Sequence, residues 1–174
     1  MAEVTAVPIL DLSRYLGRWY EICRLPLKYE DATATDTTAT YSFNDDGSVR
    51  VDNRCFDEDG EPSQALGKAT PIDGAKSRLR VTFLPEYIQW IPFTSGDYWV
   101  LKIDPEYRTA LVGTPDRKFL WLLARQPDLP QAAREEFLAE ARWQGFELSG
   151  LITPRHSGRE VTDEMVKRDE RDGA

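Results

Sequence analysis

Most of the chain alternates between apolar and polar positions with a period of two, the spacing of a β-strand that buries one face. The clearest case covers residues 37–43, where apolar side chains alternate with threonine and serine. Turn residues follow at 44–47, and a second alternating stretch covers 49–56. The pattern predicts an antiparallel hairpin with one apolar and one polar face.

The same pattern predicts eight strands, with turn residues between several of them. They are Trp19–Arg24, Thr37–Phe43, Val49–Phe56, Gln64–Thr70, Leu79–Leu84, Tyr98–Ile103, Tyr107–Val112 and Phe119–Ala124. Periodicity alone fits a closed up-and-down barrel and an open sandwich equally well. A barrel of eight strands would remove the exposed sheet edges and leave room for one small ligand.

Beyond Pro127 the period changes to that of an amphipathic helix, which we predict over residues 130–144. Its apolar stripe consists of Phe137, Leu138 and Ala141. The preceding segment, 119–124, is apolar on both faces, so its outer face needs a cover. We expect the helix to pack there, outside the strands.

Length and charge limit the possible classes of protein. A chain of 174 residues suits one domain, expected over residues 1–158, followed by a charged tail over 159–174 that is frayed or forms a short helix. The net charge of −8 argues against a nucleic-acid partner, which needs a basic face. The first residues, from Met1, do not have the pattern of a secretion signal. We expect a monomer or weak homodimer.

Three segments carry a family resemblance. Gly17-Arg18-Trp19 resembles the first signature of the lipocalins, residues 104–108 (Asp-Pro-Glu-Tyr-Arg) resemble the second, and Arg125 matches the third. Their order, their spacing and the single helix that follows make the match specific. From Leu10 to Ile152 the chain is most similar to the bacterial lipocalins, the plant temperature-induced lipocalins and apolipoprotein D.

The resemblance implies an all-β fold: an eight-stranded up-and-down antiparallel barrel with one helix packed outside. It also implies that Gly17, Trp19 and Arg125 close the floor of this barrel, with the guanidinium stacked on the indole. Members of this branch bind fatty acids, lysophospholipids or related lipids and are linked to membrane maintenance under stress. Bacterial members are often outer-membrane lipoproteins. The resemblance therefore favours the periplasm or outer membrane if a signal has been removed, and otherwise the cytoplasm remains.

A ligand would sit on the inward faces of the strands, which alternation predicts to be apolar and aromatic. The expected ligand contacts are Tyr41, Asn53, Trp121, Phe43, Val51, Phe83 and Trp99. In apolipoprotein D the positions that match the first three line the pocket. Small inward residues, such as Ala39 and Ala65, favour a cavity, while a barrel filled by aromatic side chains is the alternative.

The segment 84–93 is unusually apolar for a loop that contains two prolines. It carries Tyr87, Trp90 and Phe93. It could pack on its own barrel, form a lip over the mouth, contact another copy or touch a membrane surface.

Catalysis is not expected, and neither is a metal or another cofactor. The single histidine, His156, lies beyond the predicted barrel. Two free thiols are favoured over a disulfide. Cys55 faces inward in the predicted register, and Cys23 shares strand parity with Trp19. The alternatives to a lipid carrier are therefore a thiol-dependent lipid-modifying enzyme that uses Cys55, and a membrane-surface module whose barrel is filled.

Overall fold

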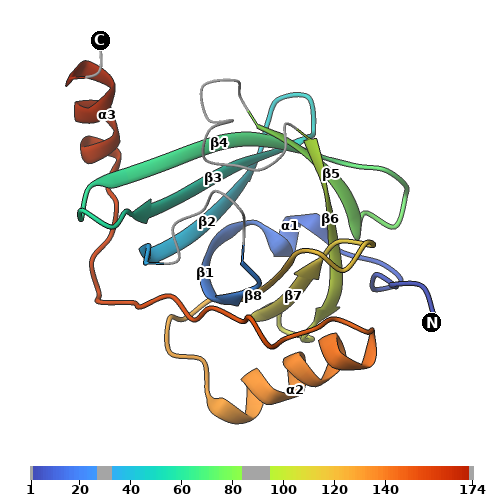
Figure 1. The fold of residues 1–174 in the computed structure, drawn as a ribbon. Coiled ribbons are helices and arrows are strands. Elements are labelled where there is room, and N and C mark those ends of the chain that lie inside the picture. Colours follow the sequence, from blue (N-terminus) through green and yellow to red (C-terminus); the bar gives the residue numbers. More distant parts are fainter. Residues whose placement is uncertain (1, 27–32, 84–94, 173–174) are drawn as a thin grey trace.

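The structure is a computed structural model that describes residues 2–26, 33–83 and 95–172. Within these ranges eight antiparallel strands follow one another around a closed barrel, in which β8 pairs back onto β1 (Figure 1). They are β1 (Gly17–Arg24), β2 (Thr35–Phe43), β3 (Val49–Phe56), β4 (Pro62–Pro71), β5 (Arg78–Phe83), β6 (Ser95–Ile103), β7 (Thr109–Gly113) and β8 (Leu120–Ala124). The fold predicted from the family resemblance is confirmed, and the open sandwich is excluded.

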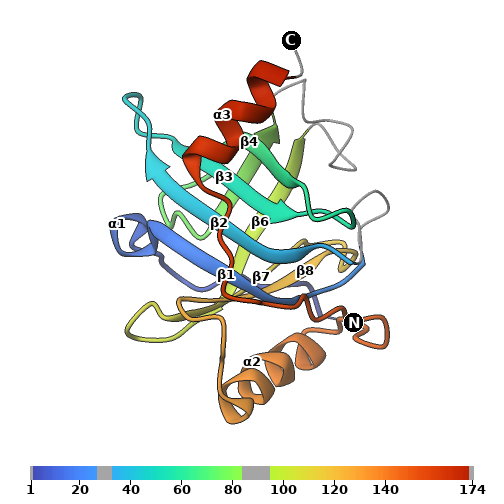
Figure 2. The same ribbon diagram turned by 90° about the vertical axis from the view of Figure 1, so that its left-hand side faces the viewer.

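Three helices accompany the barrel in the described ranges. Helix α1 (Leu12–Tyr15) begins at Asp11, whose side chain accepts a hydrogen bond from the Ser13 amide. Figure 2 shows α1 at one end of the barrel, which we call the floor. The opposite end is called the mouth. The sequence pattern did not predict α1, because a four-residue helix has no periodicity to read.

Helix α2 (Gln131–Trp143) follows β8 and lies along the outside of the barrel (Figure 1). Its ends agree with the predicted range to within one residue, and its buried side chains are Phe137, Leu138 and Ala141, as predicted. Burial of a Phe or Leu side chain contributes about 1.5–3 kcal/mol, so this stripe fixes the helix on the barrel. The charged tail contains helix α3 (Asp163–Asp172), which is attached to β3 by an ion pair between Arg54 and Asp163.

The buried apolar residues form two clusters. The inner cluster lies inside the barrel and includes Trp19, Tyr41, Val51, Val81 and Leu123. The outer cluster joins α2 to the outer faces of β1, β6, β7 and β8. The outer cluster explains why residues 119–124 are apolar on both faces: one face serves each cluster.

Two strands contain register shifts that simple alternation does not foresee. In β1 the pairing with β8 shifts between Glu21 and Cys23, and in β6 the pairing with β7 shifts between Val100 and Lys102. Such irregularities change which face of the sheet the following side chains occupy. The strand ends also differ slightly from prediction: Tyr107 lies in a turn at φ 57°, and β7 begins at Thr109.

Candidate functional site

The floor of the barrel is closed by Trp19 and Arg125. Trp19 is completely buried, and its indole N–H donates to the backbone oxygen of Tyr15 at 2.9 Å. The guanidinium carbon of Arg125 lies 3.7 Å from the centroid of the indole ring. A cation placed in this way over tryptophan contributes about 0.5–2 kcal/mol. Together the two side chains close this end of the barrel.

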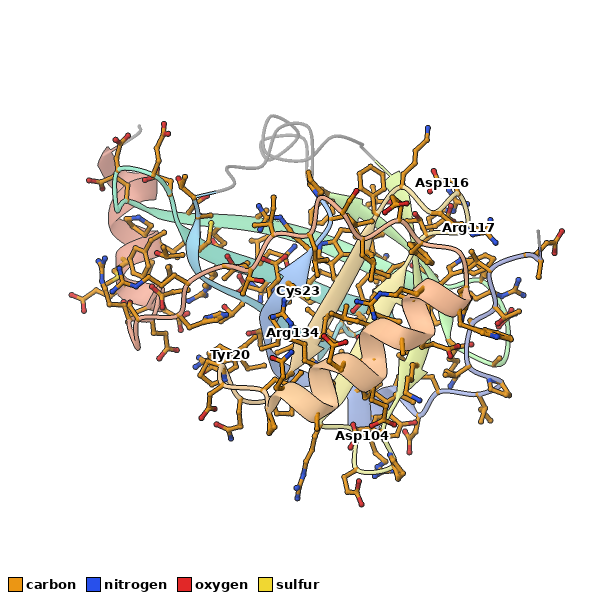
Figure 3. The ribbon with its side chains drawn as sticks, turned by 60° about the horizontal axis from the view of Figure 1, so that its bottom comes forward. Tyr20, Cys23, Asp104, Asp116, Arg117 and Arg134 are labelled. Atoms are coloured by element: carbon orange, nitrogen blue, oxygen red, sulfur yellow. The ribbon has the colours of Figure 1, made fainter. Side chains whose placement is uncertain are left out.

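Arg125 also ties together three segments of the floor through backbone oxygens. Its guanidinium donates to Leu16 and Arg18 at 3.0 Å, and to Tyr107 at 3.0 Å. Tyr107 belongs to the turn after β6, where the carboxylate of Asp104 accepts hydrogen bonds from the amides of the last turn residues. Figure 3 shows Asp104 in this turn, away from Asp116 in the turn that follows β7. The three family signatures therefore meet at the floor.

Above this closure three tyrosine hydroxyls form a chain inside the barrel. The hydroxyl oxygen of Tyr98 lies 2.6 Å from that of Tyr15 and 2.8 Å from that of Tyr41. The rings of Tyr15 and Tyr41 are stacked with their centroids 5.6 Å apart, and Tyr15 also contacts Trp19. Burial raises the pKa of Tyr41 to about 12 and those of Tyr15 and Tyr98 well above the ordinary value. All three are therefore neutral hydroxyl groups at physiological pH.

Toward the mouth some inward-facing side chains are half-buried, although Ala65 and Phe83 are buried. Asn53 is paired with Ala39 on β2 and Ala65 on β4, and both Asn53 and Ala39 retain exposed surface. Trp121, on β8, packs against the inner cluster and is also partly exposed. By contrast, Tyr41 is 6% exposed. Ala39, Asn53 and Trp121 therefore keep accessible surface, whereas the side chain of Tyr41 is buried.

A glycine on β4 makes room for an aromatic side chain of the neighbouring strand β5. Gly67 faces Phe83, and a Cβ at position 67 would lie 2.9 Å from the Phe83 ring. The Phe83 ring thus occupies the position that a side chain on β4 would need. The predicted contacts Val51 and Phe83 both belong to the inner cluster. Of the predicted set, the structure brings Tyr41, Val51, Asn53, Phe83 and Trp121 to the inner face.

Two predicted ligand contacts lie elsewhere. Trp99 packs against the outer cluster, beneath the guanidinium of Arg78 at 5.2 Å from the ring centroid, and Tyr98 is the residue that faces inward. Four successive apolar residues at 98–101 show no alternation, so only the pairing of Tyr98 with Leu79 decides the face. Phe43 has the predicted inward parity, but it lies at the floor end of β2 and is 49% exposed.

Cys23 and Cys55, both within the described ranges, are not joined by a disulfide and occupy different environments. The register shift in β1 places Cys23 in the outer cluster rather than on the face of Trp19. Figure 3 shows Cys23 on β1, close to Arg134 of α2. Burial raises the pKa of the Cys23 thiol to about 11, although the charge of Arg134 opposes this shift. Cys23 is therefore a protonated core residue.

Cys55 is half-buried and has the inward parity of Asn53. His156 lies outside the barrel, where its Nε2 is 2.7 Å from the backbone oxygen of Glu21. The His156 imidazole therefore contacts β1 on the outside of the barrel. Among the described side chains, no three His, Cys, Asp or Glu residues gather where they could hold a metal ion. No helix in the described ranges is long and apolar enough to cross a membrane.

The apolar segment with Tyr87, Trp90 and Phe93 lies outside the described residues.

Sequence reasoning missed two members of the tyrosine cluster, which consists of Tyr15, Tyr41 and Tyr98. Tyr15 belongs to the unpredicted helix α1, and Tyr98 lies in the stretch without alternation. The residue types were visible in the sequence, but no pattern indicated that the three hydroxyls meet.

A closed eight-stranded barrel with an external helix packed on it after the last strand, and with an arginine stacked on an N-terminal tryptophan, is the architecture of the calyx class of binding proteins. The family model described as a lipocalin-like domain matches residues 10–156. The chain therefore belongs to the lipocalin family.

Curated relatives agree with this assignment. Outer membrane lipoprotein Blc of Escherichia coli K12 is 41% identical over 158 residues, which cover 89% of this chain and 84% of the relative. Temperature-induced lipocalin-1 of Arabidopsis thaliana is 37% identical over 152 residues, covering 86% and 81%. Apolipoprotein D of Bos taurus is 33% identical over 127 residues, covering 69% and 63%.

Solved structures share the fold at low sequence identity. Lobster apocrustacyanin A1 superposes with a TM-score of 0.66 at 14% identity, covering 83% of this chain and 79% of that one. Insecticyanin of the tobacco hornworm Manduca sexta gives 0.64 at 20% identity, covering 94% and 87%. At these identities the similarity concerns the barrel alone.

Proposed function

We propose that this protein binds a small apolar lipid, a fatty acid or a lysophospholipid, in the mouth half of its barrel and carries or stores it. The observation that carries the proposal is the contrast along the lumen. Tyr41 and its neighbours at the floor are buried, whereas Ala39, Asn53 and Trp121 nearer the mouth keep accessible surface although they face inward. Accessible inward-facing side chains are what a ligand site in the lumen requires.

The lining suits an elongated apolar molecule. Trp121 and Phe83 offer aromatic walls, and Asn53 supplies an amide that can donate and accept hydrogen bonds. Apolar ligands gain about 25 cal/mol for each Å² removed from water, so such walls supply most of the affinity. Asn53 and Tyr41 are the proposed polar contacts.

The relatives support a role connected with membranes or stress. One bacterial relative is an outer membrane lipoprotein, and a plant relative is temperature-induced. By analogy we propose that this protein acts in the periplasm or at the outer membrane if a signal has been removed, and in the cytoplasm otherwise. Fractionation of cells that express the natural gene tests this location: recovery of a signal-processed chain in the cytosolic fraction would contradict it.

Quenching by brominated fatty acid tests the binding site directly. Bromine quenches tryptophans that it touches, so we expect Trp121 fluorescence to fall on titration. The Trp121→Phe variant should lose most of that quenching. Trp143→Phe is the matched control, because Trp143 lies on the outside of α2 and is 80% exposed. Equal quenching in wild type and Trp121→Phe, or no saturable quenching in either, would refute the proposed site.

A further inference from the structure

Strands β1 and β2 are paired with each other over only half the length of β1. Within the described ranges the pairs run from Gly17 with Tyr41 to Tyr20 with Thr38. Beyond Tyr20, the residues of β1 as far as Arg24 pair with β8 and not with β2. The barrel wall therefore contains a seam between β1 and β2 in its mouth half, where strand pairing does not close it.

Residues 152–157, which we call the strap, cover this seam from outside. Ile152 exchanges two backbone hydrogen bonds with Arg24, at 2.8 and 2.9 Å. Nε2 of His156 lies 2.7 Å from the backbone oxygen of Glu21. In Figure 2 this part of the chain, between α2 and α3, crosses the outside of β1 and β2. The strap thus occupies polar groups of β1 at the level where β2 does not.

The strap is fastened to β2 at Asp36. The Asp36 amide donates to the backbone oxygen of Arg155 at 2.9 Å. Its carboxylate accepts from the amide and the hydroxyl of Ser157, at 2.7 and 2.8 Å. Asp36 has a φ of 55°, which an L-residue keeps only where its surroundings hold it. The bonds to the strap do so, and we call the contact between Asp36 and Ser157 the latch.

Little apolar surface holds the strap in place. Pro154 is its one buried residue, whereas Thr153, Arg155 and Ser157 are exposed. Local opening costs least free energy where few apolar contacts are lost. The strap can therefore detach while the barrel stays folded.

Polar groups lie behind the seam. Glu21 is paired with Leu123 of the inner cluster, and the next inward residue, Arg24, is paired with Trp121. Glu21 and Arg24 form an ion pair at 3.3 Å and are almost completely buried. Burial of charges costs free energy, part of which hydration returns when the seam opens. The buried hydroxyl of Thr37 on β2 finds no hydrogen-bond partner among the described residues and also gains one from water.

We propose that the strap is a gate in the barrel wall: when the latch releases, β1 and β2 part in the mouth half, and a lipid chain enters or leaves the lumen sideways. This inference rests on the proposed function, since it needs a lipid in the lumen. Ala39, whose accessible surface supports that function, lies on β2 beside the seam. The gate sets the rate of lipid exchange and leaves the affinity unchanged, because the strap lies outside the lumen.

Stopped-flow kinetics test the gate. Protein loaded with anthroyloxy-labelled stearate is mixed with excess unlabelled oleate, and the fall in fluorescence gives the release rate. Ser157→Ala should release the probe about tenfold faster, the size of one hydrogen bond to a charged group. Association should be faster by the same factor, so that the dissociation constant stays the same. Asp163→Ala is the matched control, because Asp163 lies farther along the same tail and is bonded to Arg54 of β3.

The outcomes separate the two proposals. If the labelled stearate does not bind the wild-type protein, the proposed function fails. If it binds, but Ser157→Ala releases it at the wild-type rate or Asp163→Ala accelerates release equally, only the gate fails. Faster release of the probe with unchanged association would show that Ser157 supports the bound state, and this too would contradict the gate.

Hydrogen exchange on the wild-type protein avoids any dependence on a variant. The amides of Arg24, Asp36 and Ile152 donate between the strap and the two strands. They should exchange about tenfold faster than the amides that donate within the ladder between β1 and β2. Equal protection of the two groups would show that the seam opens only when the whole barrel unfolds, and would overturn the inference.

Discussion

Arg125 occupies the space in which a side chain on Gly17 would begin. An ideal Cβ on Gly17 would lie 3.3 Å from Nη1 of Arg125, and Gly17 has a φ of 99° that L-residues rarely adopt. The glycine of the first signature and the arginine of the third are therefore one structural unit. The close approach allows Arg125 to cover Trp19 and to reach the carbonyls around it.

Replacement of Gly17 by alanine should lower the free energy of unfolding by about 1–3 kcal/mol, through both the strained φ and the contact with Arg125. Urea denaturation measures this change. Gly60→Ala is the matched control, because Gly60 has a φ of 77° but nothing within 4 Å of an ideal Cβ. A loss no larger than that of Gly60→Ala would show that the contact with Arg125 contributes nothing.

Replacement of Arg125 by leucine should cost about 2–4 kcal/mol, because several backbone oxygens at the floor lose their donor and Trp19 loses its cation. The same denaturation experiment applies. Arg80→Leu serves for comparison, since Arg80 forms a surface pair with Asp97 that is worth little. Similar stabilities for the two variants would argue against a closing role for Arg125.

The three buried tyrosines make the free energy of unfolding depend on pH in the alkaline range. The pKa of Tyr41 is about 12 in the folded protein, above its ordinary value of 10, so the unfolded chain releases this proton first. The stabilisation is complete below pH 10. It is lost as the pH rises toward 12, by up to about 1.4 kcal/mol per pH unit for each buried tyrosine.

Urea titrations at several values of pH above 9 would reveal this slope. The triple variant Tyr15→Phe/Tyr41→Phe/Tyr98→Phe should lose stability less steeply over the same range, because phenylalanine has no proton to release. Parallel slopes in the two proteins would mean that the three phenols titrate normally when folded.

Ala39→Leu should narrow the mouth half of the lumen and weaken lipid binding about tenfold, because the added atoms occupy the proposed ligand space. Titration with a fluorescent fatty acid measures the affinity. Thr40→Leu adds a similar side chain to the neighbouring position on β2, on the opposite face of the sheet. If Thr40→Leu weakens binding as much as Ala39→Leu, the lumen is not the binding site.

Much of the fold could be read from the sequence where one face of a strand is polar. Tyr41, Val51 and Asn53 were placed on the inner face correctly, because hydroxyl and charged residues alternate with them. The helix over 131–143 was equally clear from its apolar stripe and from the proline before it. Both patterns reflect which side chains face water and which face the core. The order of polar and apolar residues along the chain records this directly.

The tertiary structure alone decided the rest. Trp99 and Tyr98 exchange faces relative to the prediction because β6 is covered on both sides, and its pairing with β5 sets the register. Cys23 joins the outer cluster because of a shift in pairing with β8. The motifs that contain Gly17 and Arg125 indicated the family and therefore the barrel fold. The hydroxyls of Tyr15, Tyr41 and Tyr98 come from distant segments and meet only because the barrel closes. No local sequence pattern encodes this closure.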